Sequence, residues 1–438
     1  MKRLLSLLLC AVLALFCATT AQAAGVSITL TASEYALHYA FDAGAQDPFV
    51  ILEYTTPAEK GWMMLYSEDG HFEGDVSLAY SGAGGKTSVA LTSARTTGSI
   101  GKASTTLPKA ADYQKPTGKS NAKVTDFVLT ETPEGFHYAF NAIGTDYMLL
   151  YWRSKEQTVT QPVYPDENGH YEGDVISDLT FARTQFTVQV KSGSGSMKKE
   201  ATVRKGYQAP ETPQRQEGRL GGVTVCIDAG HQENGRFVNE PIGPGLSGST
   251  SGKGGMAQGT KTNRRESIVC LEIGMLLRDE LLRQGANVIM TRGDQTTFHT
   301  NIERCEIAEA GGAQIMLRLH CNNSSNHSKR GIQVYGPLNS DYAKAVADAD
   351  TYREMGQELL DAMKTRVGMT LANSTGMVRL NDNYVGNNWA KMMCFLVEMG
   401  YLSNPAEEYL LVTPVYQQWL AEGMADGVYE IAVARGGV

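Results

Sequence analysis

The amino-terminal half of the chain contains one pattern twice, and this repeat limits the possible folds more than any other feature. The sequence HYAFDA at 38–43 recurs as HYAFNA at 137–142, and DGHFEGDV at 69–76 recurs as NGHYEGDV at 168–175. Both recurrences are separated by 99 residues, close to the size of one immunoglobulin-like domain. The 438-residue chain is therefore expected to hold two tandem domains followed by a separate carboxy-terminal part.

Each copy is predicted to be a β-sandwich of the immunoglobulin or fibronectin type. Short runs rich in Val, Thr, Tyr and Phe alternate apolar and polar residues, and Asp-Gly or Asn-Gly pairs between them are typical of hairpin turns. We expect the first repeat to span residues 24–115 and the second to span residues 122–207.

Charged residues that recur in both copies allow two interpretations. Acids in such positions can bind calcium, or they can keep exposed turns soluble. The spacing of a calcium-binding loop is absent, so we assign the acids to solubility and the recurring histidines to packing and turns. These residues are Glu73, Asp75, Glu172 and Asp174, and His38, His71, His137 and His170.

The first 23 residues have the pattern of a signal peptide. Lys2 and Arg3 precede an apolar run from Leu4 to Phe16, and the segment ends in the small-residue pattern Ala21-Gln22-Ala23. The run is shorter than the ~20 residues that span a bilayer. We expect cleavage after Ala23 and a secreted, extracellular protein whose mature form has no membrane anchor.

The charge of the chain disfavours a nucleic-acid-binding protein, and its cysteines disfavour a fold held by disulfides. The formal charge of the chain is −8, and loss of Lys2 and Arg3 with the signal peptide changes it to −10. Nucleic-acid binding is disfavoured, because it requires basic patches that neutralise phosphates. Five cysteines remain after cleavage, all in the last half and mostly inside apolar runs, which favours buried thiols over a disulfide framework.

The carboxy-terminal half has the pattern of an α/β domain with a mostly parallel sheet flanked by helices. Residues 208–219 are polar, contain two prolines and are interpreted as a linker, so the domain is expected to span 220–438. Beyond the linker, short apolar runs alternate with amphipathic stretches. The predicted strands are 223–227, 287–290, 314–319, 331–335 and 393–397, and the predicted helices are 266–283, 301–310, 343–366 and 414–434.

Polar side chains follow several of these strands at one edge of the predicted sheet. His231 follows the first strand, His320 ends the third, Glu398 ends the last, and Glu266 begins the first helix. In open α/β sheets the ligand crevice forms at the carboxyl ends of the strands. The sequence therefore predicts that these four residues converge.

Two histidines and a glutamate are a ligand set typical of catalytic zinc. We hypothesise that His231, Glu266 and His320 bind one zinc ion, and that Glu398 is the general base and then the general acid. The spacing alone leaves the alternative of ordinary rim histidines open, since no compact His-Glu-x-x-His helix is present. His299 and His327 are assigned to such structural roles.

Residues 222–434 resemble the zinc-dependent catalytic domain of N-acetylmuramoyl-L-alanine amidases, the type 3 amidases. Five segments carry the resemblance: VCIDAGH at 225–231, ESIVCL at 266–271, NVIMTR at 287–292, LHCN at 319–322 and VEMGYLSNP at 397–405. It implies that His231, Glu266 and His320 are the metal ligands and Glu398 the catalytic glutamate. Arg304 and Asn322 are candidates for the substrate rim.

Three features depart from the family pattern. Gln232 stands where many relatives have glycine, Cys321 stands where a small residue is usual, and the glycine-rich loop 241–259 is longer than in compact members. None of them removes a ligand. The loop could shape the substrate groove or be merely mobile.

The resemblance implies a cell-wall hydrolase that cleaves the amide between N-acetylmuramic acid and L-alanine in peptidoglycan, its expected partner. It also implies a location associated with the cell wall, where the β repeats could bind a wall polymer. Two alternatives stay open, a zinc peptidase acting on the stem peptide and a catalytically silent wall-binding protein.

Overall fold

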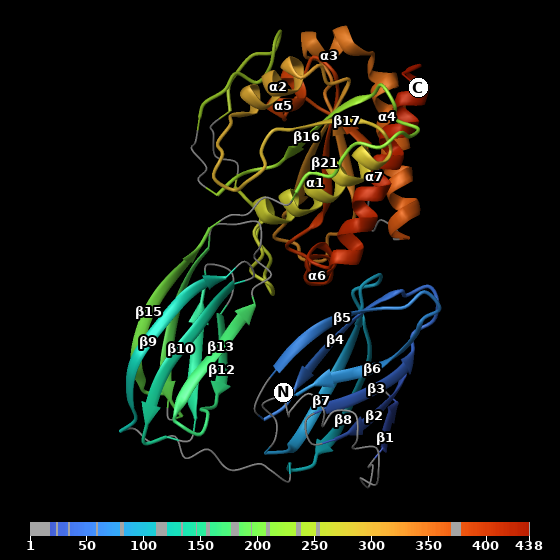
Figure 1. Cartoon of the computed structure of the whole chain (residues 1–438). Helices are drawn as coiled ribbons and strands as arrows, with labels where there is room; N and C mark the ends of the chain where they lie inside the picture. The colour runs from blue at the N-terminus through green and yellow to red at the C-terminus, as the bar shows by residue number, and fades with distance from the viewer. Residues whose placement is uncertain are drawn as a thin grey trace. The chain divides into compact units, whose positions relative to one another are not determined.

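A computed structural model of the whole chain shows β domains followed by an α/β domain (Figure 1). It describes residues 18–22, 25–33, 36–57, 60–78, 83–110, 121–132, 135–145, 147–154, 158–176, 184–193, 195–206, 211–233, 238–250, 255–368 and 378–437. The chain divides into two compact units, 1–117 and 118–438. Most of the predicted signal peptide lies outside the described residues, while its segment Ala18–Gln22 forms strand β1.

The first repeat consists of two antiparallel sheets packed over one core. One sheet has the order β1-β2-β3-β6 and the other β5-β4-β7-β8. Leu30, Phe41, Leu52 and Leu91 lie in the shared core. The remaining strands are β2 Ser27–Ala32, β3 Ala36–Asp42, β4 Phe49–Thr55, β5 Lys60–Tyr66, β6 His71–Ser77, β7 Gly85–Ser93 and β8 Ser99–Leu107.

The second repeat has the same construction within the other unit. Its sheets have the orders β13-β10-β9 and β12-β11-β14-β15, and Phe136, Phe140, Trp152 and Phe186 fill the core between them. The strands are β9 Lys123–Thr132, β10 Gly135–Ile143, β11 Met148–Arg153, β12 Thr158–Val163, β13 His170–Ile176, β14 Thr184–Ser192 and β15 Met197–Lys205. The predicted all-β sandwich architecture is confirmed for both repeats.

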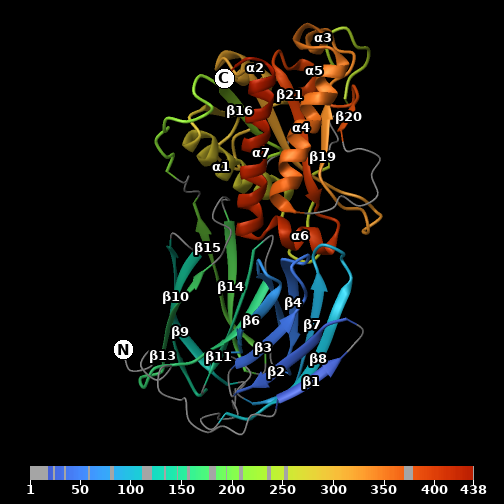
Figure 2. The ribbon, with the colours of Figure 1, turned by 90° about the vertical axis from the view of Figure 1, so that its right-hand side faces the viewer.

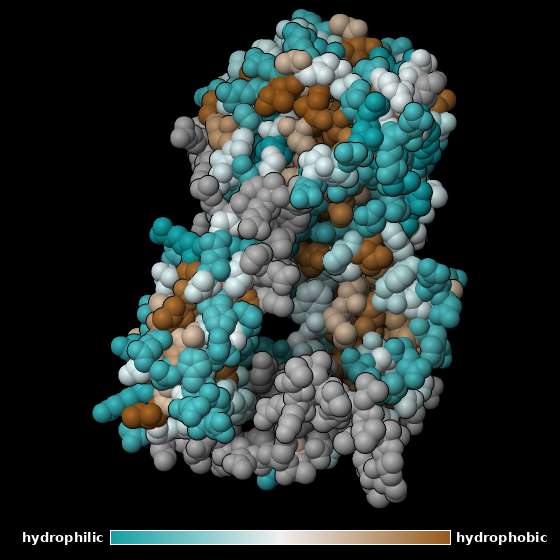
Figure 3. Space-filling model, viewed as in Figure 1, coloured by the Kyte–Doolittle hydropathy of each residue, from teal (hydrophilic) through white to brown (hydrophobic). Residues whose placement is uncertain are grey.

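Burial alternates along the strands as the sequence pattern requires. In β3, Leu37, Tyr39 and Phe41 are buried, while His38 and Ala40 lie on the solvent side. Large exposed apolar side chains such as Val128 are scattered among the described residues rather than contiguous in sequence. Figure 3 shows a face on which hydrophilic residues predominate and apolar residues form small groups.

The carboxy-terminal domain is built on a six-stranded mixed sheet of order β17-β16-β18-β21-β19-β20. The first four strands of that order are parallel, β19 is antiparallel to β21, and β20 is parallel to β19. The central strands are continuous apolar runs in the sequence, because helices cover both faces of the sheet. The bounds are β16 Thr224–Ala229, β17 Asn287–Met290, β18 Ile315–Asn322, β19 Gln333–Gly336, β20 Val378–Leu380 and β21 Met393–Tyr401.

Helices cover both faces of this sheet. Helices α1, α7 and α4 lie side by side on one face, where Gly423 and Gly427 of α7 let the backbone of α4 approach closely (Figure 2). Helices α2 and α5 pack against each other, and Cys305 and Ala308 of α2 join a core cluster with residues of β16, β18 and β21. The bounds are α1 Glu266–Arg283, α2 Asn301–Ala310, α3 Asp341–Val346, α4 Ala349–Val367, α5 Val385–Trp389, α6 Pro405–Leu411 and α7 Pro414–Ala434.

One predicted helix is two helices in the structure. The stretch 343–366 was expected to be continuous, but the backbone is extended at Ala347, and Asp348 caps α4 by accepting a hydrogen bond from the Thr351 amide. Elements β20, α5 and α6 were not predicted, because each is too short for a periodic pattern. None of the described helices is both long and apolar enough to cross a bilayer.

Candidate metal centre and active site

The four residues singled out in the sequence meet at one edge of the sheet. His231 follows β16 after Gly230, His320 lies near the end of β18, and Glu398 lies in β21. His320 and Glu398 are direct partners in the parallel pairing of β18 with β21. Glu266 is the first residue of α1. The predicted convergence at the carboxyl ends of the strands is what the structure shows.

His231, Glu266 and His320 form a cluster that could hold a metal ion. Their ligand atoms all lie within 4.8 Å of one another. Glu266 Oε1 lies 3.1 Å from His231 Nε2 and 2.9 Å from His320 Nδ1. The two imidazole rings are nearly perpendicular, with centroids 4.9 Å apart. Two imidazoles and a carboxylate converging in this way are a donor set suited to zinc.

The backbone before the cluster is specialised. His231 has a φ of +57°, in the left-handed region that a non-glycine residue seldom occupies. A Cβ added at Gly230 would come within 2.5 Å of His320 Cε1 and of the Leu319 carbonyl oxygen. Glycine at 230 therefore lets the β16 terminus approach β18 closely enough to place both imidazoles against Glu266.

Glu266 is fixed on both carboxylate oxygens. The Cys321 amide donates to Oε1 at 3.0 Å, and the Ala257 amide donates to Oε2 at 2.7 Å. Burial raises the pKa of Glu266, but His231 and His320 together lower it further, so the net pKa lies well below its ordinary value. Burial lowers the pKa of His320 despite its bond to Glu266. An ionised carboxylate beside a neutral imidazole is the protonation state that a metal ion requires.

Glu398 stands apart from the cluster in its bonding. Its Oε2 atom is buried and has no hydrogen-bond partner among the described residues. Burial raises the pKa of Glu398 well above its usual range, and the charge of Glu266 adds to that shift. Glu398 also lines the cavity, and a carboxyl group with a raised pKa in that position suits proton transfer.

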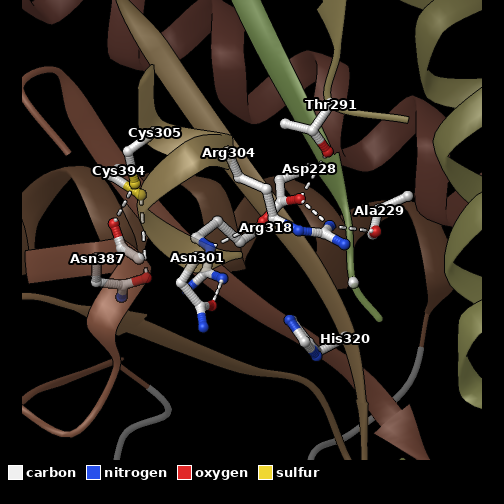
Figure 4. A network of polar contacts seen from close by, with 12 residues as sticks. Asp228, Ala229, Thr291, Asn301, Arg304, Cys305, Arg318, His320, Asn387 and Cys394 are labelled. Carbon is white, nitrogen blue, oxygen red and sulfur yellow. Dashed lines mark hydrogen bonds and ion pairs between the residues drawn. The ribbon is translucent and has the colours of Figure 1, made fainter. Parts of the chain in front are cut away.

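Behind the cluster, Asp228 is completely buried between two arginines (Figure 4). Arg318 Nε donates to its Oδ2 at 2.9 Å, Thr291 Oγ1 donates to its Oδ1 at 2.7 Å, and Arg304 Nη1 also bonds Oδ1. Burial raises the pKa of Asp228, but Arg304 and Arg318 lower it far more, so the carboxylate is ionised. This network ties β16 to β17, β18 and α2.

The carbonyls of the segment that leads to His231 all accept hydrogen bonds from buried arginines. Arg292 donates to the carbonyl of Ala229 at 2.7 Å and to that of Gly230 at 2.9 Å. Arg304 donates to the carbonyls of Ala229 at 2.9 Å and His231 at 3.2 Å. The turn that presents His231 is therefore held at consecutive carbonyls.

A cavity of about 590 Å³ opens over the cluster. It is lined by the three residues of the cluster, by Glu398, by Val238 and Glu240 just before the glycine-rich loop, and by Thr250 within the loop. The buried Glu240 carboxylate accepts from the amide of Ile302 at 2.8 Å and from the side chain of Asn301 at 2.7 Å, at the start of α2. The start of the glycine-rich loop is therefore anchored to α2 as a wall of the cavity.

Further anchors hold the same wall. The Trp389 indole donates to the Pro241 carbonyl at 2.9 Å, and the Asn388 side chain donates to the Ile242 carbonyl at 3.1 Å. Residues 251–254, in the middle of the loop, lie outside the described residues. Of the two interpretations of this loop, these contacts favour the one in which it shapes the groove.

Sequence reasoning missed a row of tyrosines beside Glu398. Tyr384 lines the cavity and bonds the hydroxyl of Tyr335, which donates in turn to Gln333 Oε1 at 2.6 Å. Asn322 Nδ2 donates to the same oxygen at 3.2 Å. Because Tyr335 donates its proton to Gln333, Tyr384 must donate to Tyr335, and the Tyr384 oxygen keeps a lone pair. No sequence motif marks Tyr384, which lies in a stretch without periodicity.

The sequence also singled out Arg304, Asn322, His327 and the cysteines. Arg304 and Asn322 both line the cavity, but the guanidinium of Arg304 is buried and bonded to Asp228, Gln232 and backbone carbonyls. Arg304 therefore holds Asp228, Gln232 and the backbone near His231 in position. His327 donates to the Ser403 carbonyl at 2.7 Å, a structural bond. The five cysteines expected in the mature chain are free and buried, as predicted.

The domain is of the α/β class, and its cluster of two histidines and a glutamate could hold a metal ion. Residues 225–430 match the family described as N-acetylmuramoyl-L-alanine amidase. This part of the chain is an N-acetylmuramoyl-L-alanine amidase domain.

Individual relatives are similar over the same region. The "Probable cell wall amidase LytH" of Staphylococcus aureus is 27% identical over 238 residues, which are 53% of this chain and 72% of that protein. An N-acetylmuramoyl-L-alanine amidase of Clostridium difficile 630 is 22% identical, with a TM-score of 0.39, over 49% of this chain and 100% of that one. The N-acetylmuramyl-L-alanine amidase of Mycobacterium smegmatis is 17% identical, with a TM-score of 0.44, over 49% of this chain and 99% of that one.

Proposed function

We propose that His231, Glu266 and His320 hold one zinc ion and that Glu398 moves the protons in hydrolysis of the bond between N-acetylmuramic acid and L-alanine. One observation carries the proposal. Three ligand atoms converge from separate segments, and beside them Glu398 lines the cavity and keeps one buried oxygen without a hydrogen-bond partner among the described residues.

The residues present fit a zinc ion. The two imidazoles and the carboxylate supply three donors and leave a position for water or substrate. A bound zinc ion would lower the pKa of a water molecule and polarise the substrate carbonyl. Glu266 is held in place by the Cys321 and Ala257 amides, so its free lone pairs are directed towards the imidazoles.

The Glu398 carboxylate accepts the proton of the attacking water and then donates it to the departing alanine nitrogen. Burial raises the pKa of Glu398, which makes the carboxylate a stronger base for the first of these steps. Tyr384 contributes a hydroxyl oxygen that accepts a hydrogen bond from a substrate N–H group.

The substrate class and location follow from the amidase family. The substrate is the peptidoglycan of the cell wall, so the enzyme works outside the cytoplasm. This location agrees with the signal-peptide pattern of the first 23 residues. The finer proposal is a secreted enzyme that stays associated with the wall.

The variant Glu398→Gln tests the role of the glutamate. It should keep zinc at the wild-type stoichiometry and lose release of stem peptides from purified peptidoglycan by roughly 100-fold or more. The exposed Glu309→Gln change in the same domain is the matched control and should retain activity. Wild-type turnover by the Glu398→Gln variant would remove Glu398 from the mechanism.

Product analysis separates this proposal from its alternatives. The amidase releases peptides whose only new amino terminus is alanine, whereas a peptidase would expose other amino termini. A catalytically silent protein would release nothing at any zinc concentration. Chelation should abolish release and zinc add-back should restore it, while His231→Ala should prevent the restoration.

A further inference from the structure

The solvent face of each β repeat carries a row of histidines and acids that the amidase reaction does not use. In the first repeat the row runs across the β3–β6 pair, where His38 lies opposite Asp75, Ala40 opposite Glu73, and Asp42 opposite His71. All five polar side chains are exposed or partly exposed. The alanine opposite Glu73 leaves the carboxylate uncovered.

The hydrogen bonds in this row fix which nitrogen of each imidazole carries a proton. His38 Nδ1 lies 3.1 Å from Asp75 Oδ1, and His71 Nδ1 lies 2.7 Å from Asp42 Oδ1. A carboxylate can only accept, so both Nδ1 atoms donate. In the neutral imidazole the Nε2 atom then carries a lone pair.

Both lone pairs face one carboxylate. His38 Nε2 lies 3.3 Å from Glu73 Oε1, and His71 Nε2 lies 3.6 Å from Glu73 Oε2. An imidazole nitrogen and a carboxylate oxygen at these distances attract each other when either a second proton or a metal cation lies between them. Without a metal ion, the hydrogen bond to Asp42 raises the pKa of His71 and favours the proton. Imidazoles that donate Nδ1–H to a carboxylate and present Nε2 are the usual form of metal-binding histidine.

The second repeat reproduces the arrangement 99 residues later. His137 Nδ1 lies 2.9 Å from Asp174 Oδ1, and its Nε2 lies 3.3 Å from Glu172 Oε1. His170 Nε2 lies 3.7 Å from Glu172 Oε2. Ala139 again lies opposite the glutamate.

One substitution between the copies strengthens the assignment of protons. Asn141 replaces Asp42, and its Nδ2 donates to Asp126 at 2.9 Å, so Oδ1 is the atom that faces His170 Nδ1 at 2.8 Å. His170 must therefore donate through Nδ1, as His71 does. The exposed neighbouring strand has diverged, with Ser27 and Thr29 of β2 replaced by Asp126 and Val128 of β9, whereas the row is otherwise kept.

We propose that each repeat binds one divalent transition-metal ion of the zinc class, through His38, Glu73 and His71 in the first copy and through His137, Glu172 and His170 in the second. Borderline-soft ions prefer imidazole nitrogen together with carboxylate oxygen. Among the described residues, the group of three ligand atoms that lie within 4.8 Å of one another is His231, Glu266 and His320, and the proposed ligands of the repeats are not that close together. The exposed side chains of the repeats close on the ion by rotation, and these sites are accordingly weaker than the catalytic one.

Metal stoichiometry of the full-length chain tests the proposal. Equilibrium dialysis at micromolar free zinc, followed by elemental analysis, should give two more bound ions for the wild type than for the Glu73→Gln, Glu172→Gln double variant. Each single variant should lose one ion. The exposed changes Glu53→Gln and Glu167→Gln, one in each repeat, are matched controls and should lose none.

Imidazole nitrogen resonances supply a second measurement. Zinc should shift Nε2 of the four repeat histidines while their Nδ1 protons persist. Equal stoichiometry in the wild type and the double variant, or Nε2 atoms that stay protonated when zinc is added, would overturn the proposal and leave a simple imidazolium–carboxylate row. A failure of the catalytic site alone would lower the count by one ion in the wild type and in every variant alike, so the two failures are distinguishable.

Discussion

The buried Asp228 network makes the most quantitative prediction about this domain. Asp228→Asn keeps the size of the side chain and removes its charge. Asn can still accept at the position of Oδ1, where Arg304 and Thr291 donate, but its amide group then faces the Nε–H of Arg318. The change leaves two nearly buried guanidinium groups without their counter-charge.

The cost follows from the burial of the partners. The exposed fractions of the side chains are 0% for Asp228, 5% for Arg304 and 4% for Arg318. Removing one member of a buried ion pair costs about 3–5 kcal/mol, because the remaining charge is desolvated and uncompensated. We therefore expect the amidase domain of the variant to be destabilised by about 3–5 kcal/mol and to bind zinc less tightly through a displaced His231.

Chemical denaturation followed by far-ultraviolet circular dichroism measures this cost. The described helices all lie between residues 266 and 434, so the helical signal reports the amidase domain within the full chain. The matched control is Asp350→Asn, which breaks an exposed pair with Arg353 in α4 and should leave the transition unchanged. A loss below about 1 kcal/mol for Asp228→Asn would refute the argument from burial.

Three further predictions concern residues around the site. Burial raises the pKa of Glu407 to about 7, even though the Tyr401 and Gly331 amides lower it. Because the folded pKa exceeds the ordinary value, the protonated carboxyl stabilises the fold fully in acid, and this contribution is lost as the pH rises through about 7. Between pH 5 and 8 the unfolding free energy of the wild type, measured by urea denaturation, should therefore fall by roughly 2 kcal/mol relative to that of Glu407→Gln. Parallel pH profiles for the two proteins would contradict this. Tyr384→Phe should raise KM for wall fragments roughly tenfold through one lost hydrogen bond, with Tyr342→Phe as an unaffected control. Glu240→Ala should raise KM with zinc content unchanged, since it releases the cavity wall from α2; an unchanged KM would mean that the wall does not contact substrate.

The convergence of the candidate residues was predictable from the sequence because a simple rule places them. Strand ends of a parallel sheet share one edge, so His231, His320 and Glu398 had to come together once the strands were recognised. The β-sandwich repeats were predictable for a similar reason, since an alternating pattern fixes which side chains face the core.

The surroundings of the cluster were not predictable in the same way. The sequence made Arg304 a candidate for the substrate rim, and Arg304 does line the cavity, but the sequence does not reveal that its guanidinium is also bonded to the buried Asp228. The Tyr384–Tyr335–Gln333 row depends on the antiparallel placement of β19 beside β21, which no local pattern encodes. The break at Ala347 depends on a single cap at Asp348 inside an otherwise helical stretch.

The arginine network also explains how a histidine in an unfavourable backbone conformation can serve as a metal ligand. A left-handed residue other than glycine costs free energy and persists only where its surroundings hold it. Around His231, the carbonyls of three consecutive residues accept hydrogen bonds from Arg292 and Arg304, and Arg304 is itself held by Asp228. The ion pair that stabilises the domain therefore also fixes the direction of His231 before any metal binds. A ligand placed in advance loses little entropy on binding, so Asp228, two residues before Gly230, would support the proposed metal centre by holding His231 in position.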